Sequence, residues 1–274
     1  MDSDIEIMFL TPPKHKVGRK STIVRNLAKF NRLWNKRLNE NPKLYNGSKF
    51  RLESTDLDNA NLILNIGITC YKDFIGTNWS PDAKKLHAEG IEIYNNKQAF
   101  MSDALGVGSF LLSSDNYVTF LKRSLHCGEA VGLWDIPGGH AEPKEITGKE
   151  TDILIEDIDS DKITEEIYDS ILREVVDEVN IPKDCLSDPL MLGIARNTTA
   201  AGRPSAEFLI RCTLTSKEIR DLYLKGSQAE ADETTNIRLL PLSEVLQMTV
   251  DHELWKMMAP SCKGCISLAK HFEF

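Results

Sequence analysis

The feature that most constrains this sequence is a helical pattern between residues 161 and 182. The segment reads DKITEEIYDSILREVVDEVNIP, and its aliphatic residues recur at intervals of four. Residues four apart lie above one another on one face of a helix, so the spacing predicts a helix from about Lys162 to Val179 with one buried face. The buried stripe consists of Ile163, Ile167, Ile171, Val175 and Val179.

A neighbouring face of the same helix carries Glu174, Asp177 and Glu178, all within about one turn. Carboxylates at this spacing repel one another by a few tenths of a kcal/mol per exposed pair. A hard divalent cation offsets such repulsion, and carboxylate oxygens are its natural ligands. The pattern also fits an ordinary acidic helix face, so the metal hypothesis depends on the surrounding sequence.

A Pro-Gly-Gly segment at 137–139 lies upstream of this helix and continues as His140-Ala141-Glu142. Two glycines permit a tight turn that presents a backbone carbonyl to a metal or a phosphate. A simple turn explains the same residues when they are considered alone.

Together, the two segments resemble the Nudix hydrolases, whose box is written G-x5-E-x7-R-E-U-x-E-E-x-G-U, with U a bulky aliphatic residue. Gly139 and Glu145 match its first part, and residues 173–181 (REVVDEVNI) match its second. Asp177 replaces one Glu, and Asn180 replaces the last Gly. Asn tolerates the left-handed conformation that ends a helix. Gly139 and Arg173 are 34 positions apart (173 − 139) where the box has 14, so an acidic, polar insertion of 20 residues, predicted to be a loop, splits the box.

The split box resembles the UDP-glucose pyrophosphatase branch of this family. Similar runs cover most of the chain: KFRL, CYKDFIGTNW, DALGVG, DIPGGHAEP, DEVNIP and MLGIARNTTAAGRPSAEF. The resemblance implies Mg²⁺-dependent hydrolysis, with Mn²⁺ as an alternative ion, of UDP-glucose or UDP-galactose to UMP and a sugar 1-phosphate. Three alternatives stay open: another nucleoside diphosphate derivative, capped RNA, or a catalytically silent binding module. The preference between the two sugars stays open as well.

The matching positions imply a catalytic set of Glu174, Asp177 and Glu178. Glu174, Glu178 and the Gly139 carbonyl are the implied metal ligands, while Asp177 binds through water or acts as the base. Glu207 is an alternative base. Arg173 is expected to orient a box carboxylate rather than to bind phosphate.

Seven further residues are expected to bind the substrate. The two aromatic candidates would stack on or hydrogen-bond the uridine, the arginine would pair with the diphosphate, and the remaining four would bind ribose or sugar hydroxyls. Half-buried packing of the aromatic residues and a solvated strand end for the arginine are the structural alternatives. The seven are Tyr45, Tyr71, Arg123, Gly128, Asp135, His140 and Glu142.

The order of elements predicts an α/β sandwich around a mixed sheet, plus a smaller α+β region at the N-terminus. Strand-like runs occur at 50–52, 62–69, 106–112, 117–122, 190–195, 206–212 and 237–240. Residues 70–79 are expected to form a loop, a helix to follow Ser80-Pro81, and a last helix to span Cys262 to His271. The resemblance makes this a Nudix α/β/α fold, with residues 1–98 contributing to substrate binding and 99–274 forming the hydrolase domain.

Charge separates the N-terminus from the rest of the chain. Residues 14–37 carry nine basic residues and no acid, whereas the whole chain has a net charge of −8. The stripe of Ile23, Leu27, Phe30, Trp34 and Leu38 predicts an amphipathic helix packed on the body, with nucleic-acid binding as the less favoured alternative. The absence of a signal peptide or membrane span predicts a soluble cytoplasmic or nuclear protein.

The six cysteines are few for this length and are expected to be reduced thiols. Cys262 and Cys265 form a C-x-x-C motif without a second pair, which is a poor zinc site, so a structural role is expected. Oligomeric state cannot be derived from the sequence.

Overall fold

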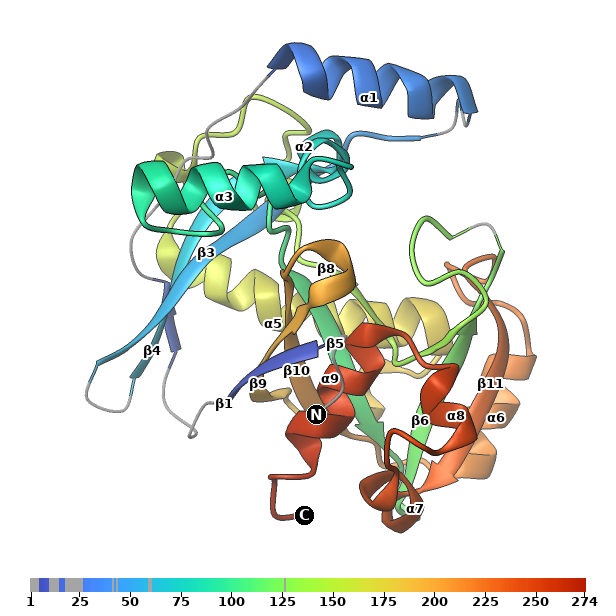
Figure 1. Ribbon diagram of the computed structural model, residues 1–274. Coiled ribbons are helices and arrows are strands. Elements are labelled where there is room, and N and C mark those ends of the chain that lie inside the picture. The colour runs from blue at the N-terminus through green and yellow to red at the C-terminus, as the bar shows by residue number, and fades with distance from the viewer. Residues whose placement is uncertain are drawn as a thin grey trace.

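The computed structural model describes residues 5–9, 15–17, 27–40, 42, 44–58, 61–125 and 127–274 of the chain. An eight-stranded mixed sheet runs through the molecule in the order β1-β9-β10-β5-β6-β11, with β8 paired to β5 and β7 paired to β6 (Figure 1). β10 and β5 are parallel, whereas β1–β9, β9–β10 and β6–β11 are antiparallel. The strands are β1 (Ile5–Phe9), β5 (Gly106–Leu112), β6 (Tyr117–Arg123), β7 (Trp134–Asp135), β8 (Gly138–His140), β9 (Leu190–Asn197), β10 (Arg203–Arg211) and β11 (Thr234–Pro241).

Both faces of this sheet are apolar because successive side chains on a strand point in opposite directions. On β5, Val107 and Leu111 belong to one buried cluster, and Phe110 and Leu112 belong to another. A sheet that is apolar on both faces needs a helix layer on each side.

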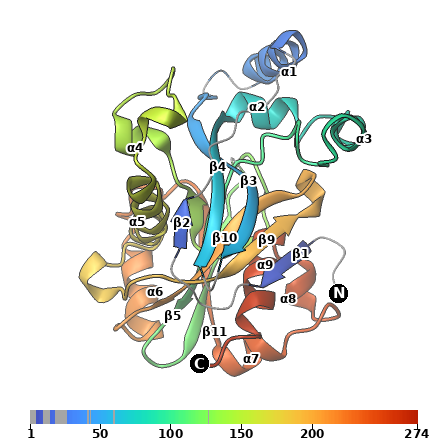
Figure 2. The ribbon, with the colours of Figure 1, turned by 90° about the vertical axis from the view of Figure 1, so that its left-hand side faces the viewer.

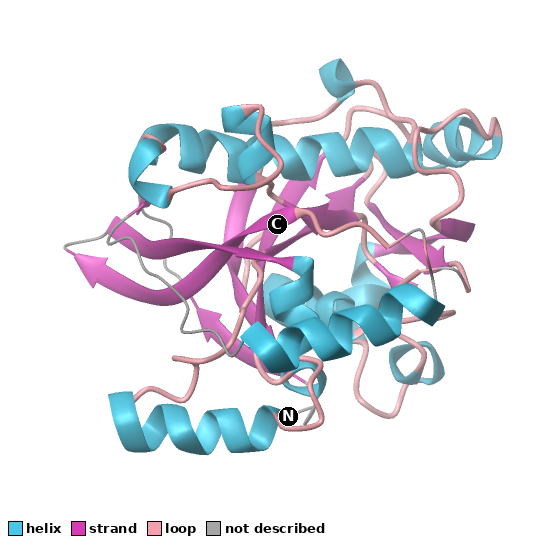
Figure 3. Ribbon diagram, turned by 90° about the horizontal axis from the view of Figure 1, so that it is seen from above, coloured by secondary structure: helices cyan, strands magenta, loops and turns pink. Residues whose placement is uncertain are grey.

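Helix α5 (Ser160–Val179) covers one face, and α9 (Pro260–Ala269) covers the other. Figure 3 shows the strands lying between helices on both sides. The remaining helices of this part are α4 (Pro143–Thr147), α6 (Ser216–Leu224), α7 (Leu242–Gln247) and α8 (Glu253–Lys256).

A second sheet, in the order β2-β4-β3, packs against the same core as α5 (Figure 2). Its strands are β2 (His15–Val17), β3 (Ser48–Asp58) and β4 (Asn61–Cys70), and α1 (Leu27–Glu40), α2 (Tyr71–Gly76) and α3 (Ala83–Tyr94) complete this part. The chain before β5 adds to the edge of β3, since Leu105 donates its backbone N–H to the Phe50 carbonyl and Leu52 donates to the Asp103 carbonyl. Residues of the N-terminal region thereby reach the main sheet.

The predicted helix with the acidic face is confirmed, because all five residues of its aliphatic stripe are buried. The strand predictions are confirmed as well, with bounds that extend up to six residues further. The loop expected at 70–79 is wrong over Tyr71–Gly76, which forms helix α2 because Phe74 and Ile75 bury their side chains there. The insertion is also more than a polar loop, since Ile155 and Ile158 pack into the core around α5.

The basic amphipathic helix is present as α1, and its Trp34 is buried. Ile23 lies outside the described residues, as do the side chains of Leu27 and Phe30. Strand β1 pairs with β9 of the main sheet, and the division at residue 98 stays a prediction. No helix in the described part of the chain is long and apolar enough to cross a membrane.

Candidate active site

A pocket of about 770 Å³ lies where the two sheets, α5 and α9 meet. Its walls contain residues from β3, β5, β8, α5, β10 and α9, so segments far apart in the sequence form one site. Pockets of roughly 300–1,000 Å³ are typical of small-molecule sites. The size fits a ligand with several chemical parts.

All predicted site residues line this pocket except Glu178 and the alternative base Glu207. Glu178 is 2% exposed, and its carboxylate accepts a hydrogen bond of 2.8 Å from the Gly138 backbone N–H. The structure therefore brings the predicted residues together, and their individual roles stay predictions. The lining residues are Tyr45, Tyr71, Arg123, Gly128, Asp135, Gly139, His140, Glu142, Glu174 and Asp177.

The glycine turn packs directly on helix α5. A Cβ atom on Gly138 would overlap the Val107 carbonyl, so only glycine fits there. A Cβ atom on Gly139 would overlap the Glu174 carboxylate, which would have to move away. The backbone N–H of His140 donates to Glu174 at 3.3 Å. Asn180 ends the helix in the left-handed conformation, with φ of 67°, as its replacement of the box glycine requires.

Two acids that sequence analysis missed complete this side of the pocket. Glu230 and Glu233 come from the loop between α6 and β11, and both line the pocket. One ligand atom from each of Glu178, Glu230 and Glu233 lies within 4.8 Å of the others. The Glu230 backbone N–H donates to the Asp177 carbonyl at 3.0 Å, which fixes this loop to the end of α5.

These carboxylates shift one another's ionisation. Burial, followed by the charge of Glu230, raises the pKa of Glu174 to about 8. Burial and then Glu174 raise the pKa of Glu178 well above its usual value, and burial and then Glu233 raise the pKa of Glu230 to about 7. Converging acids with raised pKa values gain most from a bound cation, which replaces the missing positive charge.

The donor set therefore fits a divalent metal ion. Glu174, Glu178, Glu230 and Glu233 supply only oxygen ligands, which Mg²⁺, Mn²⁺ and Ca²⁺ prefer over the softer ions that need sulfur or imidazole. The Gly139 carbonyl was predicted as another ligand, and that role stays a prediction.

Positive side chains face the acids across the pocket. Arg123 donates from Nε to the Glu129 carbonyl at 3.0 Å and lies 3.9 Å from Asp135. Arg203 contacts the Glu129 carboxylate at 3.2 Å, and Lys49 forms an ion pair with Glu142. All three cations line the pocket and are less than one fifth exposed, a setting in which they bind phosphate oxygens strongly.

His140 is held in its neutral form. Its Nε2 lies 3.2 Å from Nη1 of Arg203, which can only donate, so Nε2 accepts. Burial, then the charges of Lys49 and Arg203, lower the pKa of His140 well below its usual value. A neutral imidazole at this position leaves Nδ1 able to donate to a ligand hydroxyl or phosphate.

Aromatic side chains form a further wall. Tyr71 stacks on Phe74 with ring centroids 6.2 Å apart and meets Trp34 of α1 edge-on at 6.2 Å. Trp79 also lines the pocket and lies 5.1 Å from Phe74. Tyr45 is 53% exposed, with the Lys144 ammonium 5.9 Å above its ring. Tyr71 is therefore the fixed aromatic surface, and Tyr45 lies nearer the mouth.

Asp135, which lines the pocket, and Glu207, which does not, are both buried. Asp135 accepts hydrogen bonds from the Ser261 hydroxyl at 2.9 and 3.1 Å, and burial raises its pKa. Burial also raises the pKa of Glu207 to about 8. Glu207 is 0% exposed and is not among the residues that line the pocket, which disfavours the alternative that it serves as the base.

Arg173 forms its ion pair with Glu166 at 2.6 Å rather than with an acid of the box. Glu166 in turn accepts from the Glu142 backbone N–H at 3.1 Å. The pair thus supports the segment between β8 and α4, which follows the glycine turn.

All six cysteines are free, and Cys262 and Cys265 are fully buried in α9. Burial raises the pKa of both thiols well above the usual value, so neither is a reactive thiolate. The structural role expected from sequence is consistent with this burial.

The comparisons with known proteins agree with the geometry. The chain is 42% identical to the uridine diphosphate glucose pyrophosphatase NUDT22 of Bos taurus over 241 residues, which cover 86% of this chain and 82% of the relative. It is 33% identical to Nudix hydrolase 9 of Arabidopsis thaliana over 229 residues, covering 79% and 72%.

No protein-family model matches the chain. Among solved structures, the MutT protein from Methanosarcina mazei covers 60% of this chain and 89% of its own, with 15% identity and a TM-score of 0.36.

Proposed function

This chain belongs to the Nudix-type UDP-glucose pyrophosphatases, and from that premise we propose that it hydrolyses the diphosphate bond of UDP-glucose and UDP-galactose. The products would be UMP and the sugar 1-phosphate. One observation carries the proposal: converging acids and three shielded cations face each other across a single pocket with an aromatic wall. In a nucleotide sugar, the diphosphate would lie between the metal-binding acids and the cations, and the base would lie against the aromatic wall.

Nudix hydrolases use a divalent metal, and we propose Mg²⁺ for this chain. Glu174, Glu178, Glu230 and Glu233 would hold it, with Gly139 contributing its carbonyl. When bound, the ion neutralises phosphate charge and lowers the pKa of a coordinated water. The hydrogen bonds from Gly138 to Glu178 and from His140 to Glu174 orient the two carboxylates before any ion arrives.

The positive side chains would hold the diphosphate in line for attack. Both arginines contact Glu129: Arg123 donates to its backbone carbonyl, and Arg203 pairs with its carboxylate. These contacts hold the two guanidinium groups in separate positions. Phosphoryl transfer depends mostly on such positioning and on charge stabilisation, so no covalent role for the protein is needed.

A base must accept the proton of the attacking water. Asp177 suits this role because it lines the pocket from α5 and is not among the proposed metal ligands. Its carboxylate would accept the proton or bind the metal through a water molecule.

Recognition of the nucleoside and sugar would use the remaining lining residues. Tyr71 is the proposed surface for the uracil ring, and Tyr45 would close over it from the mouth. Asp135, His140, Glu142 and the Gly128 backbone would bind hydroxyl groups. We propose that residues 1–98 contribute to substrate binding through Tyr45, Lys49 and Tyr71, and that 99–274 form the hydrolase domain.

The test is a substrate panel with the purified protein. UDP-glucose, UDP-galactose, ADP-ribose, UTP and capped RNA are incubated with Mg²⁺, Mn²⁺ or EDTA, and products are identified by phosphorus NMR. We expect UMP and sugar 1-phosphate from the UDP-hexoses, and no turnover in EDTA. Turnover of capped RNA or ADP-ribose without UDP-hexose hydrolysis would contradict the proposal, and no turnover at all would identify a silent binding module.

A further inference from the structure

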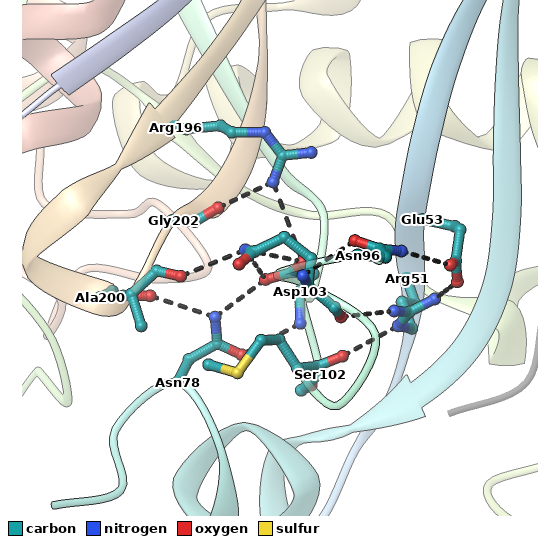
Figure 4. A network of polar contacts seen from close by, with 12 residues as sticks. Arg51, Glu53, Asn78, Asn96, Ser102, Asp103, Arg196, Ala200 and Gly202 are labelled. Carbon is teal, nitrogen blue, oxygen red and sulfur yellow. Dashed lines mark hydrogen bonds and ion pairs between the residues drawn. The ribbon is translucent and has the colours of Figure 1, made fainter. Parts of the chain in front are cut away.

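A second polar cluster lies behind the pocket and takes no part in the chemistry proposed above (Figure 4). Its centre is Asp103, which is 0% exposed and lies in the chain between α3 and β5. Three side chains surround its carboxylate: Asn78 Nδ2 donates at 2.9 Å, Gln98 Nε2 donates at 3.0 and 3.1 Å, and Arg196 Nη1 forms an ion pair at 3.8 Å. The Asp103 backbone N–H also donates to Asn78 Oδ1 at 3.0 Å.

The same three donors hold three successive carbonyls of the turn between β9 and β10. Asn78 Nδ2 also donates to the Ala200 carbonyl at 3.1 Å, and Gln98 Nε2 to the Ala201 carbonyl at 3.2 Å. Arg196 Nη1 donates to the Gly202 carbonyl at 3.0 Å. Each side chain therefore bridges the Asp103 carboxylate and the turn: Asn78 and Gln98 through hydrogen bonds to the carboxylate, and Arg196 through its ion pair.

The opposite side of this turn forms part of the pocket. Asn197, Thr199 and Ala200 line it, and Arg203 follows directly as the first residue of β10. The Arg203 guanidinium contacts His140 and Glu129, while its buried Nε has no hydrogen-bond partner among the described residues. A shift of the turn would move this guanidinium relative to the acids on α5.

We propose that Asp103 is a positioning residue of the substrate pocket. It aligns Asn78, Gln98 and Arg196, and these side chains hold the 197–202 turn and Arg203 in the position in which they contact the substrate. Asp103 does not line the pocket, so it acts through the turn and not by contact. The inference rests on the proposed function, because substrate affinity is its kinetic readout.

The cost of burying this carboxylate argues against a role in stability alone. Asp103 adopts φ of 43°, in the left-handed region, which Asp and Asn occupy more readily than other non-glycine residues. Burial raises its pKa to about 6 although Arg196 opposes the shift, so holding the charge in this place is unfavourable at neutral pH. Arg51, on β3, is the other cation that acts on it. Unfavourable features of this kind collect where geometry serves function.

The test compares Asp103→Asn with Glu53→Gln. Asn tolerates the left-handed backbone and has nearly the same volume, but it offers one acceptor and an NH₂ group to three converging donors. Glu53 belongs to the far end of the same network, where it contacts Arg51 and Asn96 and does not line the pocket. We expect Asp103→Asn to raise KM for UDP-glucose ~10-fold with kcat changed less than ~3-fold, and Glu53→Gln to leave both unchanged.

Amide hydrogen exchange of residues 197–203 supplies a readout that does not depend on turnover. We expect faster exchange there in Asp103→Asn and wild-type exchange in Glu53→Gln. Gln98→Met, which removes the donor to Ala201 and keeps the charge of Asp103, should change both readouts in the same direction by a smaller amount. It also keeps the inference testable if Asp103→Asn folds poorly.

Unchanged KM and exchange in Asp103→Asn would overturn the inference, as would an equal KM increase in Glu53→Gln. If the wild-type protein did not hydrolyse UDP-glucose, the proposed function would fail, while faster exchange confined to 197–203 in Asp103→Asn would still support the positioning role.

Discussion

Burial raises the pKa values of two groups of carboxylates in this protein, and the groups differ in what surrounds them. In the first group other acids add to the effect of burial: Glu230 raises the pKa of Glu174, Glu174 that of Glu178, and Glu233 that of Glu230. Asp103 faces two amide donors and an arginine, and burial alone raises its pKa. The first group lacks positive charge and is suited to a cation from solution. In the second group, side chains of the protein itself surround the Asp103 carboxylate, so this carboxylate is suited to holding a turn in place.

The largest expected effect comes from the first group. Replacing Glu174 or Glu178 with Gln removes a metal-ligand charge, so turnover of UDP-glucose should fall at least ~100-fold. The fold should persist, because each change also removes like-charge repulsion. Steady-state kinetics at saturating Mg²⁺, with circular dichroism as the folding control, measures this. Near wild-type hydrolysis in both variants would show that these acids do not hold the metal.

The same acids predict how stability depends on pH without metal. Their pKa values are raised above those of the unfolded chain, from 4.5 to about 8 for Glu174 and to about 7 for Glu230. The folded state then binds more protons than the unfolded state between pH ~4.5 and ~8, so its stability falls as pH rises through this window. Urea unfolding in EDTA at pH 5 and pH 8 measures the loss.

Magnesium should reverse that trend, because it binds the ionised acids of the folded state and releases their protons. Added Mg²⁺ is therefore expected to stabilise the protein much more at pH 8 than at pH 5. Equal stabilisation at both pH values would indicate an ion site away from these carboxylates.

A smaller effect is expected at the aromatic wall, which belongs to neither group. Tyr71→Ala should raise KM for UDP-glucose about 10-fold and weaken the preference for uridine over adenosine substrates, with little loss in kcat. The reason is that the acids recognise only diphosphate, so base selection must come from stacking and hydrogen bonds. Tyr45→Ala is the matched control at the exposed mouth and should have a weaker effect. An unchanged profile for Tyr71→Ala across the substrate panel would place base recognition elsewhere.

The two groups of carboxylates differ in how much of each could be predicted from the sequence. Helix α5 could be predicted because its aliphatic residues follow the helical period, and Glu174 and Glu178 follow from their places on that helix. Gly139 could be predicted because it matches the first position of the box motif, and the structure places it against the Glu174 carboxylate. Residues that share one face of a helix or strand can be recognised in a sequence because their spacing is regular.

Glu230, Glu233 and Arg203 could not be assigned in this way. The two glutamates lie in a loop without periodicity, in an acidic run (AEADE) that resembles any solvated loop. Lys49 stood in the KFRL run, yet nothing in that run indicates that β3 places its ammonium beside Glu142. Asp103 meets Asn78, from the chain between α2 and α3, and Arg196, from β9, only in the folded protein. Contacts between distant segments leave no spacing pattern in the sequence.

The smallest effect is expected for the stability of the Asp103→Asn variant. Its dependence on pH distinguishes a buried carboxylate that stabilises the fold from one that holds a turn in position. The pKa of Asp103 rises from 3.8 to about 6 on folding, so at pH 7.5 its charge lowers stability and at pH 5 its protonation restores part of that loss. Asn cannot ionise, so the variant lacks this gain. Relative to wild type, we expect Asp103→Asn to be within about 1 kcal/mol at pH 7.5 and less stable at pH 5. Urea unfolding in EDTA at the two pH values measures both differences, with Glu53→Gln as the network control. A larger loss at pH 7.5 than at pH 5 would mean that the ionised carboxylate stabilises the fold, and the contrast between the two groups of acids would then be wrong.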